Sequence, residues 1–228
     1  MKKIRDWAHA IFFETFAAFA SLTLRCIPIQ YSIRGNGQPI LLVHGYLYSS
    51  SIWFLFKKRL EALGFGPIYT IDLTPPFSPL AAYAKQLEKK AEQIQKETKK
   101  KELILIGHSM GGLVCALYAT EFAPPNTITD IITIASPFFG TSMADMGIGK
   151  NAKEMCLGSP TLREIREKIA ESKGIRFFHI ATKTDLVVIP SSSEICPNHR
   201  SHCFRDLGHM SLLFSKKVLD QVASWLSE

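Results

Sequence analysis

The sequence has no run of about 20 apolar residues, which is the length that a membrane-spanning helix needs. The apolar part of its first 25 residues is shorter and contains Glu14. The five cysteines are an odd number at scattered positions, which does not indicate the disulfide framework of a small secreted domain. With 228 residues, of which 46% are hydrophobic, the chain can bury one sizeable core.

The basic residues do not form the pattern of a nucleic-acid-binding surface, although the net charge is +7. Much of the excess lies in residues 85–101, where lysines alternate with glutamates and apolar residues recur at helical spacing. That pattern is typical of the solvated face of an amphipathic helix. No aromatic residues interleave with these lysines, so the sequence predicts no nucleic-acid partner.

One cysteine-rich stretch, Cys196–Cys203, raises the question of a metal site because His199 and His202 lie between its two thiols. The spacing matches no common zinc pattern, and ligands packed so closely along the chain would strain a tetrahedral site. We therefore expect no metal and an ordinary loop. A disulfide formed in an exported state and a zinc site are the alternatives.

Residues 1–28 are predicted to form a hydrophobic or amphipathic helix that precedes the main domain. Lys2, Lys3 and Arg5 come before an apolar segment rich in phenylalanine. This pattern fits a helix that contacts a membrane peripherally through residues 1–25, a secretory signal peptide cleaved after residues 18–20, or a helix packed on the protein's own surface. Glu14 argues against the signal peptide, and the aromatic residues favour the membrane interface. The predicted localisation is membrane-associated or exported, with a cytoplasmic location as the alternative.

Residues 29–228 are predicted to form one α/β domain, because continuous aliphatic runs alternate with helical patterns. Such runs are typical of buried parallel strands, so we expect a mostly parallel central sheet with helices on both faces. A longer stretch at residues 141–173 interrupts the alternation. The predicted strands are residues 31–34, 39–43, 68–71, 103–106, 128–134 and 175–180, and the predicted helices are residues 52–63, 85–101, 113–119, 161–171 and 211–226.

The most informative segment is Gly107–Gly111, with the sequence Gly-His-Ser-Met-Gly, which joins a buried strand directly to a helix. A strand that turns into a helix over two or three residues strains the residue at its apex and leaves room only for small neighbours. The turn raises the apex hydroxyl and places it near the positive end of the following helix. We therefore predict that Ser109 is a catalytic nucleophile.

A serine nucleophile needs a base, and the base needs a carboxylate to orient it. After a turn of this kind the acid and then the histidine follow along the chain. Asp185 follows a predicted strand, at the sheet edge where α/β proteins gather their catalytic groups, and is the predicted acid. His209 lies in the loop before the last predicted helix and is the predicted base. The alternatives are Asp72, Glu194 and Asp206 for the acid, and His199 and His202 for the base.

The predicted oxyanion hole consists of two backbone N–H groups. One belongs to Met110, which directly follows the nucleophile at the start of a helix. The other belongs to Tyr46, because Gly45 before it lets the backbone turn inward after the strand at residues 39–43.

These residues resemble motifs of the α/β-hydrolase superfamily, in particular its lipase-like serine esterases and the small bacterial triacylglycerol lipases. The resemblance covers about residues 39–226. Its motifs are Val43–Tyr46, Gly107–Gly112, Thr133–Thr141, Lys183–Val188 and Gly208–Leu213. It implies the α/β-hydrolase fold and hydrolysis of carboxylic esters through an acyl-serine intermediate, without a cofactor.

The predicted substrate is a lipid or a small acyl ester, which we expect to contact Phe138, Phe139 and Leu47. The stretch at residues 141–173 is expected either to cover the acyl channel as a cap or lid, or to pack on the core as a surface excursion. The same triad serves an acyltransferase or an amidase, so both remain alternatives, as does a non-catalytic binding module with this fold.

Overall fold

The computed structural model describes residues 35–189 and 199–228. The predicted N-terminal helix at residues 1–28 and the predicted strand at residues 31–34 lie outside the described residues. So do Glu194 and Cys196.

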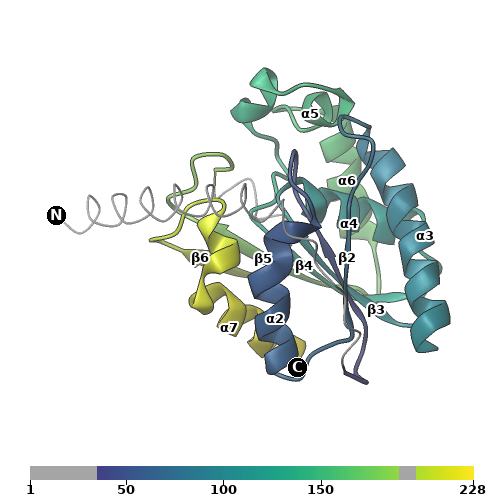
Figure 1. The fold of residues 1–228 in the computed structure, drawn as a ribbon. Helices are drawn as coiled ribbons and strands as arrows, with labels where there is room; N and C mark the ends of the chain where they lie inside the picture. The colour runs from purple at the N-terminus through teal and green to yellow at the C-terminus, as the bar shows by residue number, and fades with distance from the viewer. Residues whose placement is uncertain (1–34, 190–198) are drawn as a thin grey trace.

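The described residues contain one six-stranded sheet in which every pair of neighbouring strands is parallel. Figure 1 shows this sheet at the centre of the fold, between the helices. The strands are β1 (Ile40–Val43), β2 (Ile68–Ile71), β3 (Leu103–His108), β4 (Ile128–Ile134), β5 (Arg176–Thr182) and β6 (Arg200–Phe204), in the order β2-β1-β3-β4-β5-β6. The chain moves outward from β1 to β2 and then returns to place β3 on the other side of β1. Parallel sheets bind ligands outside the carboxyl ends of the strands at such a reversal.

Two layers of helices cover the sheet and confirm the predicted α/β-hydrolase fold. The layers follow from the alternation along each strand, since Leu41 and Val43 face one core cluster while Ile40 and Leu42 face the other. One layer holds α3 (Leu80–Thr98), α4 (Met110–Glu121) and α6 (Pro160–Glu171), and the other holds α2 (Phe54–Ala62) and α7 (Lys216–Leu226). No helix among the described residues is both long enough and apolar enough to cross a bilayer.

Two predicted helices differ in detail from the structure. The helix predicted at residues 52–63 begins as the 3₁₀ turn η1 (Ser50–Trp53) and continues as α2. The helix predicted at residues 211–226 consists of two elements, η4 (Ser211–Phe214) and α7. Ser215 separates them because its ψ of 128° is extended rather than helical.

The loop predicted for Cys196–Cys203 is wrong at its end, where Arg200–Phe204 forms β6. This strand pairs with β5 at the edge of the sheet. Arg200, Ser201 and His202 are exposed, so the strand lacks the apolar run by which the buried strands were predicted. An edge strand pairs on one side only and tolerates charged and polar residues.

The stretch at residues 141–173 divides into two parts. Its second part is α6, which buries Leu162, Ile165 and Ile169 in the same cluster as α3 and α4. The first part holds η2 (Ser142–Met146) and α5 (Lys150–Glu154), and α5 lies at the top of Figure 1, beyond the end of α6. We call residues 141–154 the cap segment.

Candidate active site

Ser109 lies at the turn between β3 and α4 in a backbone conformation that is rare for a residue with a side chain, with φ 54° and ψ −125°. The turn is tight. A methyl group on Gly107 would lie 2.5 Å from the carbonyl carbon of Gly111, and one on Gly111 would lie 2.7 Å from the carbonyl oxygen of His44. The two glycines are therefore required by close backbone contacts, as the strand–turn–helix pattern predicted.

The start of α4 provides an electropositive environment for the Ser109 hydroxyl. Met110 is the first residue of the helix, so its N–H lies in the first turn, where backbone donors have no acceptor within the helix. The helix dipole adds partial positive charge at the same point. Negative charge that develops next to Ser109 would be stabilised there.

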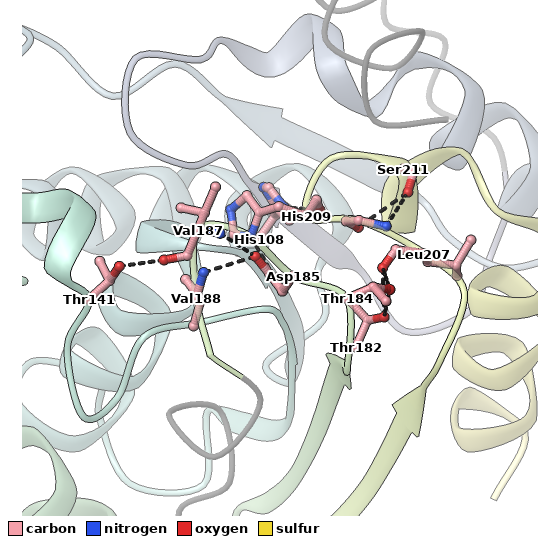
Figure 2. Close-up of polar contacts among 11 residues, drawn as sticks. His108, Thr141, Thr182, Thr184, Asp185, Val187, Val188, Leu207, His209 and Ser211 are labelled. Carbon is pink, nitrogen blue, oxygen red and sulfur yellow. Dashed lines mark hydrogen bonds and ion pairs between the residues drawn. The ribbon is translucent and has the colours of Figure 1, made fainter. Parts of the chain in front are cut away.

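Asp185 and His209 form a buried pair. The Nδ1 of His209 lies 2.9 Å from Oδ2 of Asp185, and both residues are more than nine-tenths buried. The other carboxylate oxygen accepts hydrogen bonds from the backbone N–H groups of Val187 and Val188, each at 2.8 Å (Figure 2). An ionised carboxylate only accepts hydrogen bonds, so Nδ1 carries the proton and Nε2 is left as the basic nitrogen.

The other acids considered from the sequence have different partners. Asp72 accepts hydrogen bonds from the backbone N–H of Ser50 at 2.6 Å and from its hydroxyl at 3.0 Å, at the start of η1. Asp206 forms an ion pair with Lys217 at 2.5 Å. Of the acids in the described residues that were considered, Asp185 is the one that the structure brings to His209.

The loop before His209 is held by hydrogen bonds from two directions (Figure 2). The hydroxyls of Thr182 and Thr184 both donate to the carbonyl oxygen of Leu207, at 2.6 and 2.7 Å. The hydroxyl of Ser211 accepts from the N–H of Gly208 at 2.7 Å. The backbone that leads to His209 is therefore held by β5 and by the loop that carries Asp185 (the acid loop) on one side, and by η4 on the other.

His108 connects the nucleophile turn to the same loop. Its Nε2 lies 3.1 Å from the carbonyl oxygen of His209, and the centroids of the two rings are 4.7 Å apart. A carbonyl only accepts, so Nε2 of His108 carries the proton. Burial, followed by the proximity of His209, holds the pKa of His108 well below its usual value, which keeps this ring neutral.

His44 fixes the peptide that is predicted to donate to the oxyanion. Its Nε2 accepts from the N–H of Leu73 at 3.0 Å, so its Nδ1 is protonated and donates to the carbonyl oxygen of Gly45 at 2.8 Å. That carbonyl belongs to the same peptide unit as the N–H of Tyr46, so the bond fixes the direction of both. A methyl group on Gly45 would lie 3.0 Å from Cβ of Ser109, which places this loop against the nucleophile.

The model of the alpha/beta hydrolase family matches residues 40–179, from β1 into β5. This chain belongs to that family. Several solved structures share its fold. The lipase BlEst2 of Bacillus licheniformis in its mature form superimposes with a TM-score of 0.73 at 16% identity, covering 88% of this chain and 95% of that one. The product of the gene lin2722 of Listeria innocua gives 0.68 at 18%, with 84% and 94% covered.

Curated relatives of this chain include one protein named as an esterase and one named as a lipase. The pimeloyl-[acyl-carrier protein] methyl ester esterase of Vibrio vulnificus is 30% identical over 121 residues, which cover 53% of this chain and 46% of that protein. Triacylglycerol lipase 2 of Saccharomyces cerevisiae is 35% identical over 98 residues, which cover 41% and 29%. The matched part spans less than half the length of each relative.

The residues predicted to contact a substrate differ in exposure. Leu47 is 54% exposed, and Phe139 is 43% exposed with the guanidinium of Arg166 4.3 Å from its ring centroid. Phe138 is completely buried and packs against the ring of His179, with centroids 5.7 Å apart. Phe138 is thus a core residue that presents no surface to a substrate.

The ring contacts of His44, His108 and His179 were not predicted from the sequence. His44 and His108 directly precede Gly45 and Ser109, and this position is the one local signal of their roles. His179 has no such signal. Among the described residues, no group of three or more His, Cys, Asp or Glu side chains could hold a metal ion.

Proposed function

We propose that this hydrolase cleaves carboxylic esters by nucleophilic catalysis, with Ser109 as nucleophile, His209 as base and Asp185 as the orienting acid. The observation that carries the proposal is the buried bond between Asp185 and His209, which lies beside the strained turn at Ser109. The hydrogen bond from His108 to His209 supports that placement, since it joins the residue next to Ser109 to the backbone of the base.

The proposed reaction has two halves. In the first, the Ser109 oxygen attacks the acyl carbon while its proton moves to Nε2 of His209, and the backbone N–H groups of Tyr46 and Met110 stabilise the resulting oxyanion. The intermediate collapses, the proton passes from Nε2 to the departing alcohol, and an acyl-serine remains. In the second half, water loses a proton to the same nitrogen, attacks the acyl carbon and releases the acid. Neither half requires a cofactor or a metal ion.

We propose lipid-like acyl esters as the substrate class because of the apolar side chains around the site. Nine large hydrophobic side chains are exposed in the described part of the chain. All except Leu63 lie in the connections that follow the carboxyl ends of β1, β4 and β5, before the next long helix or the next strand. These eight are Leu47, Phe139, Met143, Met146, Ile148, Leu157, Leu186 and Ile189. Exposed apolar groups gathered at one end of a protein are typical of a surface that binds an apolar ligand.

We further propose that residues 1–25 contact a membrane peripherally, and that this protein is membrane-associated or exported. Its support is the sequence pattern of basic residues followed by an aromatic-rich apolar segment.

The test is hydrolysis of p-nitrophenyl esters, from acetate to palmitate, in solution and in micelles. We expect the wild type and Ser172→Ala, a variant at the opposite end of the sheet, to hydrolyse them, and Ser109→Ala to lose turnover. Absence of hydrolysis by the folded wild type on every ester would contradict the proposal. Hydrolysis confined to short soluble esters would contradict the proposed lipid-like substrates, while the proposed ester hydrolysis would stand.

A further inference from the structure

Tyr46 makes a contact that the proposed reaction does not explain. Its hydroxyl donates to the carbonyl oxygen of Ile148 at 2.8 Å and accepts from the N–H of the same residue, also at 2.8 Å. Ile148 lies in the cap segment, 102 positions further along the chain. One hydroxyl therefore bonds to both backbone groups of Ile148. It joins the cap segment to the loop after β1 that carries Gly45 and Tyr46, which we call the oxyanion loop.

The cap segment is fixed at this point by a second set of contacts. The N–H of Lys150 donates to the carbonyl oxygen of Phe77 at 3.0 Å, and the rings of Tyr46 and Phe77 pack with centroids 6.2 Å apart. Gly149 has φ +98°, and a methyl group on it would lie 2.8 Å from Cα of Phe77. The turn at residues 148–150 thus rests directly on the loop after β2, and only glycine allows so close an approach.

The cap segment also contacts the loop that carries Asp185 and the start of α4. At its start, the hydroxyl of Thr141 donates to the carbonyl oxygen of Val187, whose own N–H donates to Asp185 (Figure 2). In α5, the buried side-chain amide of Asn151 lies 3.6 Å from the sulfur of Met110. The cap segment therefore contacts the oxyanion loop, the acid loop and the first residue of α4.

We propose that the cap segment acts as a brace, a fixed element whose contacts hold the loops of the active site in place. Within it, the bond to Ile148 makes the Tyr46 hydroxyl a positioning group, which keeps the backbone N–H of Tyr46 in the oxyanion hole. This inference rests on the proposed function. His44 fixes the peptide between Gly45 and Tyr46 from one side, and the bond to Ile148 fixes the Tyr46 side chain from the other. Such restraints matter for the rate because a displacement of about 1 Å in a catalytic group can lower it about 100-fold.

The decisive variant is Tyr46→Phe, which keeps the ring on Phe77 and the backbone N–H but removes the hydroxyl. The contact with Ile148 is accessible to solvent, so water replaces the hydroxyl and the fold is retained. We expect kcat on p-nitrophenyl butyrate to fall about tenfold while KM changes by less than about twofold, since the lost interaction acts on the transition state.

A second measurement distinguishes positioning from a general loss of structure. An alkylboronic acid forms a tetrahedral adduct with a serine nucleophile and places an oxygen in the oxyanion hole. Its inhibition constant is expected to rise in Tyr46→Phe by the same factor as kcat falls. A variant Gly149→Ala, which displaces the cap turn from Phe77 and leaves Tyr46 intact, is expected to show the same pattern.

The matched control is Tyr69→Phe, which removes a hydroxyl from the outer strand β2 and is expected to keep wild-type kinetics. If Tyr46→Phe and Gly149→Ala both keep the wild-type kcat and boronate affinity, the brace is overturned while the hydrolase remains. A fall in kcat without a change in boronate affinity also overturns it. If the wild type and Tyr69→Phe are themselves inactive, the proposed function fails instead.

Discussion

The Nε2–H of His108 donates to the backbone carbonyl of His209 across 3.1 Å, which joins two residues that are 101 positions apart in the chain. His108 is the last residue of β3 and directly precedes Ser109. The ring of His209 in turn pairs with Asp185. A single buried bond therefore links the strand that carries the nucleophile to the backbone of the base.

Replacing His108 tests the importance of this bond. His108→Leu leaves the buried carbonyl of His209 without this donor, which costs about 1–3 kcal/mol of stability. Because the loop that carries the base is loosened, we expect kcat/KM to fall about tenfold. His108→Gln retains an N–H donor and is expected to recover part of both losses. Urea unfolding and ester kinetics measure the two effects, and wild-type kinetics in His108→Leu would contradict this role.

Replacing Asp185 tests the orientation of the base. In Asp185→Asn the carboxamide cannot favour the protonated Nδ1 of His209 as the carboxylate does, so kcat is expected to fall about 10³–10⁴-fold with the fold retained. Asp206→Asn is the control, because Asp206 pairs with Lys217 near the surface. A comparable loss of kcat in both variants, or no loss in Asp185→Asn, would show that the acid is misassigned.

The nucleophile turn makes a prediction about stability. A methyl group on Gly111 would lie 2.7 Å from the carbonyl oxygen of His44 and closer still to that of Val43, so backbone must move. Gly111→Ala is therefore expected to lower the free energy of unfolding by about 3 kcal/mol or more. Gly174→Ala is the matched control, since Gly174 has φ +81° with no atom within 4 Å of an added methyl group. Its cost is about 1 kcal/mol of backbone strain. Similar costs for the two variants would contradict the tight turn.

His179 makes the stability depend on pH. Burial, together with the nearby His199 ring, lowers the pKa of His179 to about 3, so the folded protein keeps this ring neutral in weak acid. The unfolded chain binds a proton there below about pH 6.5. The free energy of unfolding therefore falls as the pH falls from about 6.5 toward 3, by at most about 1.4 kcal/mol per pH unit from this residue.

The pH effect can be assigned by comparing two variants. His179→Gln can still bond to the hydroxyl of Thr133, which lies 2.7 Å from Nδ1 of the histidine, and it should show a shallower decline of stability between pH 6 and pH 4. His202→Gln changes an exposed residue of β6 and should decline as the wild type does. Equal slopes for the wild type and His179→Gln in urea unfolding would rule out the buried neutral ring as the cause.

The layers of the fold and the elements around Ser109 could be predicted because each depends on a local pattern. Aliphatic runs such as Leu103–Ile106 indicate buried parallel strands wherever they occur. The glycines around Ser109 indicate a tight turn because the constraint acts over a few neighbouring residues. The approach of Asp185 to His209 was predictable from the order of the motifs along the chain.

Other features could not be predicted because they depend on partners that are distant in the sequence. β6 forms from exposed polar residues, and only the free edge of β5 determines that it pairs there. Phe138 is aromatic and follows the carboxyl end of β4, but it is buried in the core and contacts His179 of β5, which lies 41 positions further along the chain. The bond from Tyr46 to Ile148 joins a loop to a cap turn and has no local pattern.

The most direct test of the proposed triad is covalent labelling with a fluorophosphonate, which reacts with an activated serine. We expect one adduct, located on Ser109 by peptide mass spectrometry, that is absent in Ser109→Ala and forms far more slowly in Asp185→Asn. Two results would contradict the assignment of Ser109 as the nucleophile. The first is a folded wild type that takes up no label, and the second is equal labelling of the wild type and Ser109→Ala.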